Sequence, residues 1–178
     1  MELIGSKTEQ NLRSAISGEA QAAILYEFFA KRAKKDGFEN IAAIFKETSK
    51  NEKAHAEIYL ELLNCLHTTD KNLFAAAAAE KHESLKMYPS FAKVAREEGF
   101  ETIAATFEMV GKIESEHRER FEKQGFMVEN GAVFSKGEKT EWICQNCGHR
   151  HSAENAPEIC PVCKHPRAYF KPICCKDN

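Results

Sequence analysis

The 178-residue sequence lacks three features that would indicate whole classes of protein. It has no apolar run close to the roughly 20 residues that a membrane-spanning helix needs, so we expect no membrane partner. Its formal net charge is −2, so no excess of positive charge favours nucleic acid as a partner. It also has no basic segment followed by an apolar one at its start, as a signal peptide would. We therefore expect a cytoplasmic protein.

Proline is almost absent from residues 8–124, where Pro89 alone interrupts apolar residues that recur at helical spacing. We predict an all-helical domain over residues 1–127. The other four prolines and six of the seven cysteines lie further along, among short β-prone pieces such as Ala132–Phe134 and Trp142–Ile143. Residues 128–178 are therefore predicted to form a small second domain of strands and loops.

The helical region contains an internal repeat with an offset of 62 residues, in which Asp36–Phe45 matches Glu98–Phe107 without gaps. Two helix pairs built alike predict a four-helix bundle. Each pair should turn at a glycine, Gly37 or Gly99, because a left-handed helix cap favours glycine. The predicted helices span about residues 8–35, 39–63, 72–87 and 100–123, with a short helix after Pro89; residues 64–71 connect the pairs.

Each predicted helix directs at least one carboxylate into its apolar seam. Buried carboxylates without partners each cost several kcal/mol, whereas a pair of metal ions would stabilise them together. In a Glu-x-x-His motif both side chains lie on one helix face, and carboxylates with one imidazole per metal suit iron or manganese. The candidate ligands of this site are Glu19, Glu52, His55, Glu80, Glu83, Glu114 and His117.

The two Glu-x-x-His motifs are specific because they occupy the same register of the repeat, whereas a single copy is expected by chance about once in such a sequence. Glu80 and Glu83 are individually weaker candidates, since Glu-x-x-Glu is common on exposed helices, and Glu83 alone could equally be a surface charge. Tyr26 and Tyr88 lie on the same seams and have two interpretations. Each is either a core aromatic with a bonded hydroxyl or a hydrogen-bond donor or redox partner beside the metals.

Two Cys-x-x-Cys motifs, separated by twelve residues, predict a tetrahedral four-thiolate metal site. Zinc and iron both accept tetrahedral sulfur, so the motifs leave the metal open. Zinc would make the domain a structural or partner-binding module, and iron would make it a one-electron relay. The four predicted ligands are Cys144, Cys147, Cys160 and Cys163.

For the remaining aromatic residues, histidines and cysteines we expect no role in metal binding. We expect most of the apolar packing of the small second domain from three aromatic residues, Trp142, Tyr169 and Phe170. The nearby histidines lie outside the ligand spacing and are expected to be exposed: His149, His151 and His165. The remaining cysteines are expected to be free thiols: Cys65, Cys174 and Cys175.

The order of these parts resembles the rubrerythrin family, in which a ferritin-like bundle with a di-iron site precedes a rubredoxin-like domain. The resemblance covers nearly the entire chain. It rests on Gly18–Glu19, both Glu-x-x-His motifs, Glu80–Glu83, Tyr88–Phe100 and both cysteine motifs. It implies a mainly α fold, two non-haem iron ions in a carboxylate-bridged site and one iron ion in the four-cysteine site.

The resemblance also implies fixed ligands for the two non-haem iron ions. Glu19 and Glu80 would each bind one of them, and Glu52 and Glu114 would bridge them. His117 would bind the second iron ion.

Two further ligands would change with the oxidation state of the site. His55 and Glu83 would alternate as ligands of the first iron ion. An additional carboxylate distinguishes this site from a plain ferritin-like one, so Glu83 is the most informative residue. With Tyr26 and Tyr88 it forms the set of catalytic candidates.

The activity implied by the resemblance is reduction of hydrogen peroxide to water by a diferrous site that is re-reduced through the four-cysteine iron, in defence against oxidative stress. The expected partners are hydrogen peroxide, an external electron donor such as a reductase or rubredoxin-type protein, and further copies in a homodimer or larger assembly. One alternative is a ferroxidase or iron-handling protein, which would take up far more iron. Another is a non-enzymatic interaction protein whose cysteines bind zinc, and such a protein would be colourless.

Overall fold

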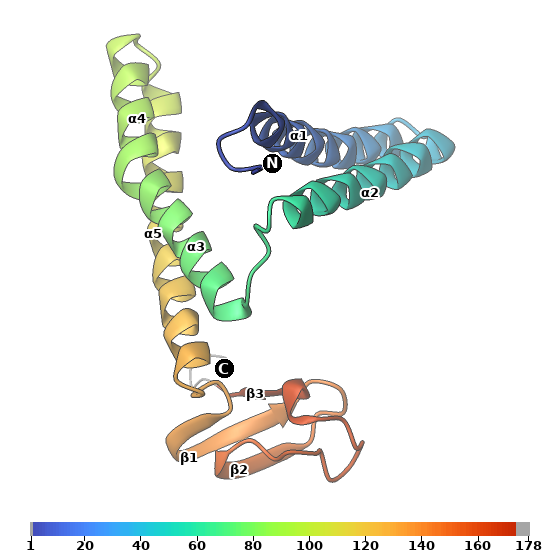
Figure 1. Ribbon diagram of the computed structural model, residues 1–178, viewed down its shortest axis with the longest axis vertical. Coiled ribbons are helices and arrows are strands. Elements are labelled where there is room, and N and C mark those ends of the chain that lie inside the picture. Colours follow the sequence, from blue (N-terminus) through green and yellow to red (C-terminus); the bar gives the residue numbers. More distant parts are fainter. Residues whose placement is uncertain (1, 174–178) are drawn as a thin grey trace. The chain divides into compact units, whose positions relative to one another are not determined.

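The computed structural model describes residues 2–173 and shows a helical region followed by a small β domain, so the predicted mainly α fold class is confirmed (Figure 1). The chain divides into two compact units between His67 and Thr68. Cys174 and Cys175 lie outside the described residues. In the described part of the chain, no helix has the length and apolar character needed to cross a membrane.

The first unit is a helical hairpin of α1 (Lys7–Lys35) and α2 (Glu39–Leu62), which match the predicted helices to within one residue at each end. The turn between them contains Gly37 with a φ of 85°, a left-handed conformation that favours glycine as predicted. The helices pack through small buried residues, including Ala30 and Ala42. The buried hydroxyl of Ser49 donates a hydrogen bond to the Ala23 carbonyl across the pair at 2.8 Å.

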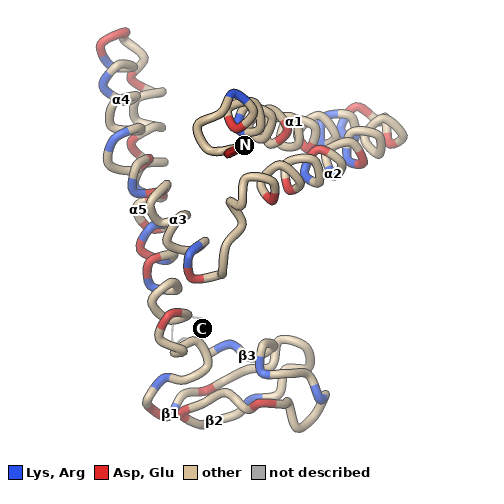
Figure 2. The backbone as a smooth tube through the Cα atoms, in the orientation of Figure 1, with Lys and Arg blue, Asp and Glu red and all other residues tan. Residues whose placement is uncertain are grey.

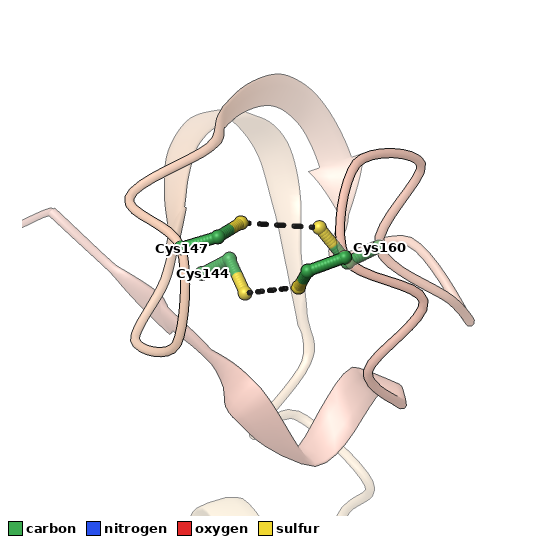
Figure 3. Close-up of side chains that lie close together, drawn as sticks. Cys144, Cys147 and Cys160 are labelled. Carbon is green, nitrogen blue, oxygen red and sulfur yellow. Dashed lines mark hydrogen bonds between the residues drawn. The ribbon is translucent and has the colours of Figure 1, made fainter.

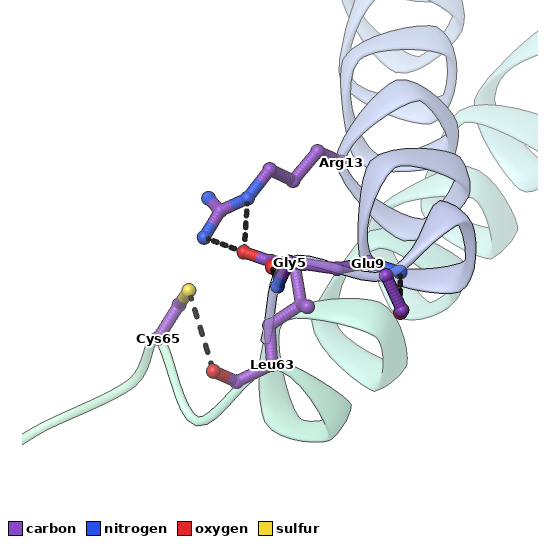
Figure 4. A network of polar contacts seen from close by, with 6 residues as sticks. Gly5, Glu9, Arg13, Leu63 and Cys65 are labelled. Carbon is purple, nitrogen blue, oxygen red and sulfur yellow. Dashed lines mark hydrogen bonds and ion pairs between the residues drawn. The ribbon is translucent and has the colours of Figure 1, made fainter. Parts of the chain in front are cut away.

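Polar contacts organise the start of this hairpin (Figure 4). The Glu9 carboxylate accepts hydrogen bonds from the Gly5 amide at 2.6 Å and from Arg13 Nη2 at 2.7 Å. At the same end of the hairpin, just after α2, the Cys65 thiol donates to the Leu63 carbonyl at 3.7 Å. Cys65 is a free thiol, as predicted.

The second unit begins with one continuous helical run that packs along a single long helix. The run consists of α3 (Thr69–His82), a five-residue π-helix η1 (Glu83–Met87) and α4 (Tyr88–Glu97), and the long helix is α5 (Glu101–Glu129). Gly99, with a φ of 84°, lies in the turn between α4 and α5, as predicted.

Two helix ends of the second unit differ from the predicted ones. α3 begins three residues before the expected residue 72, and α5 continues six residues beyond the expected residue 123. The extension of α5 has a packing reason, because the Phe126 ring packs edge-on against Phe74 of α3 at 5.2 Å between centroids. This pair links the first turns of α3 to the last turns of α5.

The C-terminal domain is a three-stranded antiparallel sheet in the order β2–β1–β3, made of β1 (Ser135–Cys144), β2 (Arg150–Asn155) and β3 (Phe170–Pro172). A short 3₁₀ helix, η2 (Arg167–Tyr169), precedes β3. Trp142–Ile143 lies in β1 as expected, but Ala132–Phe134 precedes the strand, so that part of the prediction was wrong.

The core of this domain consists of Trp142, Cys144, Ala156, Cys160 and Phe170. Two of these five residues are predicted metal ligands, so packing and metal binding depend on each other. The indole N–H of Trp142 donates to the Ala153 carbonyl at 3.0 Å, which satisfies its one polar group.

Two expectations about the residues around this core were wrong. Tyr169 is 41% exposed, because its ring lies edge-on against His165 outside the core, 4.4 Å away between centroids. The three histidines expected to be exposed are half-buried instead: His149, His151 and His165.

Candidate metal centres

Two groups of one imidazole and two carboxylates occur at nearly equivalent positions of the repeat. In the first unit, α1 supplies Glu19 and α2 supplies Glu52 and His55, with one ligand atom of each within 4.8 Å of the others. The Nδ1 atom of His55 lies 2.9 Å from Glu52 Oε2 and 3.8 Å from Glu19 Oε2. We call this set the first triad.

The second unit contains a matching second triad of Glu80 from α3 with Glu114 and His117 from α5. The Nδ1 atom of His117 lies 2.6 Å from Glu114 Oε2 and 3.9 Å from Glu80 Oε2. These distances follow the same order as in the first triad. Both triads thus offer one nitrogen and two carboxylate groups around one point, the donor set that suits iron or manganese.

The charge balance of the second triad favours a cation. Burial, followed by the neighbouring carboxylate of Glu114, raises the pKa of Glu80 above its ordinary value. Without a metal ion, the charged form of the Glu80 side chain is therefore disfavoured. A metal ion would relieve both effects, so these side chains fit a metal centre.

The π-helix explains a difference of one residue between the two halves of the repeat. Tyr26 follows Glu19 by seven residues, whereas Tyr88 follows Glu80 by eight. Since η1 lies between Glu80 and Tyr88, its wider turn accommodates the additional residue without ending the helix. This π-helix was not predicted from the sequence, although the eight-residue spacing was its visible signal.

Glu83 lies at the start of this π-helix, half-buried and outside the second triad. Its charge nevertheless acts on Glu80 and on Tyr88. The pKa of Tyr88 is raised, first by burial and then by the carboxylates around it, so its hydroxyl keeps its proton at neutral pH. The structure therefore places Glu83 and Tyr88 beside the second triad.

Tyr26, the counterpart of Tyr88, is half-buried among aromatic rings of the hairpin. Its ring centroid lies 6.1 Å from that of Phe45 and 6.2 Å from that of Phe29. Tyr88 has equivalent neighbours, with centroid distances of 6.1 Å to Phe107 and 6.4 Å to Phe91. Both tyrosines thus pack as core aromatics, and this packing is compatible with either interpretation from the sequence.

The four predicted thiolate ligands converge between two loops of the C-terminal domain (Figure 3). The sulfur atoms of Cys144 and Cys163 are 3.7 Å apart, as are those of Cys147 and Cys160. A tetrahedron with metal–sulfur bonds of about 2.3 Å has sulfur–sulfur edges of about 3.8 Å. The sulfur positions therefore fit a tetrahedral metal ion.

The thiols of this cluster differ in how readily they lose a proton. The backbone N–H of His165 stabilises the Cys163 thiolate and lowers its pKa to about 5. At Cys147, the backbone N–H of His149 favours the thiolate, but desolvation and the neighbouring sulfur atoms outweigh it and raise the pKa to about 12. A metal ion is therefore needed to remove the last protons, as is usual for thiolate sites.

Comparison with protein families identifies both parts of the chain. Residues 10–124 match the family model described as "Rubrerythrin", which includes all residues of both triads. Residues 142–171 match the model described as "Rubrerythrin, rubredoxin-like domain", which includes all four clustered cysteines.

Individual relatives match over nearly the full chain. The chain is 43% identical to a rubrerythrin of Porphyromonas gingivalis, over 95% of this chain and 91% of that protein. It is 42% identical to a rubrerythrin of Nitratidesulfovibrio vulgaris, over 95% of each. It is also 30% identical to the nigerythrin of the same bacterium, over 94% of this chain and 86% of that protein.

Proposed function

Because the chain belongs to the rubrerythrin family, we propose that it is a non-haem di-iron peroxidase that reduces hydrogen peroxide to water. The chain carries the carboxylate–histidine groups of the family's di-iron site and the four cysteines of its rubredoxin-like iron site. The observation that supports the proposal is the combination of both sites in one chain with Glu83, an additional carboxylate beside the second triad.

In this proposal the two triads hold the iron pair. Glu19 and Glu80 would each hold one iron ion, and Glu52 and Glu114 would be shared by the two ions, as the family resemblance implies. The four carboxylates balance the positive charge of the two ions, so the centre can be partly buried at an acceptable cost. The imidazoles of His55 and His117 would complete the two ligand sets, and Glu83 would alternate with His55 as a ligand.

Bound as a diferrous pair, iron supplies the two electrons that, with two protons, convert one hydrogen peroxide molecule into two water molecules. The side chains around the pair position the substrate and move the protons. Tyr88 keeps its hydroxyl proton at neutral pH and can donate a hydrogen bond to a peroxide oxygen. In this proposal Glu83, whose charge acts on both Glu80 and Tyr88, passes protons toward the substrate.

The cysteine domain provides the route for electrons in this proposal. Cys144 and Cys160 are buried, whereas Cys147 is exposed, so one side of the four-sulfur cluster meets solvent. An exposed sulfur ligand shortens the distance to a reduced partner. We further propose a cytoplasmic homodimer or larger homo-oligomer that receives its electrons from an external reductase or rubredoxin-type protein.

The proposal is tested by mixing the fully reduced protein with hydrogen peroxide in a stopped-flow instrument. The di-iron site and the four-cysteine iron are followed separately by their absorbance. We expect rapid oxidation of both sites, with two electrons consumed per peroxide molecule. Slow oxidation by peroxide together with rapid oxidation by dioxygen in the presence of added ferrous iron would contradict the peroxidase assignment.

A further inference from the structure

A groove of about 540 Å³ runs between α1 and α2, and its lining is strongly basic. It carries five lysines and one carboxylate, together with the buried Ser49. The whole chain has a net charge of −2, so this positive charge is local; Figure 2 shows basic positions on both α1 and α2. We call this feature the lysine groove, and its charged residues are Glu27, Lys31, Lys34, Lys46, Lys50 and Lys53.

Most of the lysine charge in the groove is not neutralised within the described part of the chain. Lys53 pairs with Glu27, and Lys34 pairs with Glu39 at 3.2 Å. No salt bridge of Lys46 or Lys50 is found among residues 2–173, and Lys31 lies over the Phe28 ring at 5.1 Å. Several like charges held along one groove raise the free energy of the protein unless an anion binds there.

The internal repeat shows that this charge is not a general property of the helix hairpins. At the offset of 62 residues, Glu108 takes the place of Lys46 and Ser115 takes the place of Lys53. In the second hairpin, formed by α4 and α5, the remaining cations are mostly paired, as in the contact of Arg96 Nη1 with Glu108 at 2.7 Å. The equivalent groove is lined partly by aromatic rings, those of Tyr88 and Phe107.

We propose that the lysine groove binds an acidic segment of a partner protein. The three lysines on α2 at positions 46, 50 and 53 span about 10 Å along the helix axis, given a rise of 1.5 Å per residue. A row of charges of this length matches several carboxylates along a polypeptide better than one small anion.

The chemistry of the lining favours protein carboxylates over nucleic acid. The residues that line the lysine groove include no aromatic side chain on which a base could stack. They also include no arginine, whose planar group binds phosphate through two hydrogen bonds. Lysine ammonium groups act instead as point charges on flexible stems and adapt to irregularly spaced carboxylates.

The test measures binding of a fluorescein-labelled polyglutamate peptide of about ten residues to the full-length, iron-loaded protein by fluorescence anisotropy. The double variant Lys31→Glu/Lys50→Glu reverses two charges of the groove. The matched control Lys93→Glu/Lys112→Glu makes the same change at the equivalent positions of the second hairpin. We expect at least a tenfold loss of affinity in the groove variant and less than a twofold change in the control at about 50 mM salt.

Equal losses in both variants would overturn the proposal, because attraction to net charge alone would then explain the binding. Tighter groove-dependent binding of a single-stranded oligonucleotide of equal charge would also overturn it. If the charge reversal prevents folding, the milder variant Lys31→Gln/Lys50→Gln replaces it. This variant should also bind the peptide more weakly than the parent protein does. Peroxide turnover should remain unchanged in both groove variants, so the result is independent of the proposed peroxidase activity.

Discussion

At the scale of single residues, the Glu80 carboxylate combines partial burial with a like charge on Glu114, and both raise its pKa. A carboxyl group whose pKa is raised in the folded state stabilises that state below its ordinary pKa of 4.5, and this contribution is lost as the pH rises through the raised value. As the pH rises toward neutral, ionisation of Glu80 should therefore lower the stability of the metal-free protein. Iron binding should restore this stability.

The substitution Glu80→Gln tests this balance. At pH 7 we expect the metal-free variant to melt a few degrees higher than the metal-free parent, because the disfavoured charge is gone. The same variant should bind iron more weakly at its second triad. Below about pH 4 the difference in melting temperature should vanish, since Glu80 is then protonated in both states. A lower melting temperature at pH 7, with Glu97→Gln unchanged, would contradict this account.

The role of Glu83 can be tested by comparing iron content with peroxide turnover. Because Glu83 lies beside the second triad and not in it, the substitution Glu83→Ala should leave most of the bound iron in place. Peroxide turnover should nevertheless fall by about a hundredfold, the lower end of what a positioned proton-transfer group contributes. Turnover per bound iron is the quantity to compare. Unchanged turnover at full iron occupancy would count against a catalytic role of Glu83.

At the scale of elements, the π-helix η1 keeps both Glu80 and Tyr88 in their repeat-equivalent places despite one additional residue. Deletion of Leu85, which is 57% exposed, should convert η1 into an ordinary α-helical turn with little loss of packing. Glu80 and Tyr88 would then lie seven residues apart in a continuous α-helix, as Glu19 and Tyr26 do, so their relative orientation should be retained.

The expected result of the Leu85 deletion is a protein with normal helix content that keeps the iron of its second triad. Iron content and far-ultraviolet circular dichroism measure these two properties. The substitution Leu85→Ala is the matched control, because it removes the same side chain without changing the register. Loss of this iron in the deletion variant would contradict the account and show that the wider turn of η1 is itself needed to place Glu80.

The elements also show what the sequence could and could not predict. Helix turns at Gly37 and Gly99 were predicted correctly, because a positive φ favours glycine independently of tertiary structure. The three clusters of candidate ligands were found because helical periodicity and cysteine spacing determine which side chains share a face or a loop. The extended end of α5 was missed, because it depends on the packing of Phe126 against Phe74, two residues far apart in the sequence.

At the scale of the whole molecule, the helical units and the cysteine domain depend on metal to different degrees. The core of the cysteine domain has only five buried residues, of which Cys144 and Cys160 are ligands. A core of this size does not stabilise a fold without its metal. The hairpin of α1 and α2, by contrast, packs through its own small residues.

We therefore expect metal removal by a chelator under mildly denaturing conditions to unfold the cysteine domain first. Limited proteolysis followed by mass spectrometry should then show cleavage within residues 135–172 before any cleavage within α1 or α2. Restoring iron should restore protection of residues 135–172. Simultaneous cleavage of both regions would show that the domains unfold as one cooperative unit.

The buried indole of Trp142 gives this molecule an optical property of practical use. It is the single tryptophan of the chain, and it lies in the same core as two of the sulfur ligands. Tryptophan fluorescence therefore originates from the cysteine domain alone, because the helices contain no tryptophan. A coloured iron centre so close by quenches the emission, so the intensity distinguishes iron-filled from zinc-filled protein without any added dye.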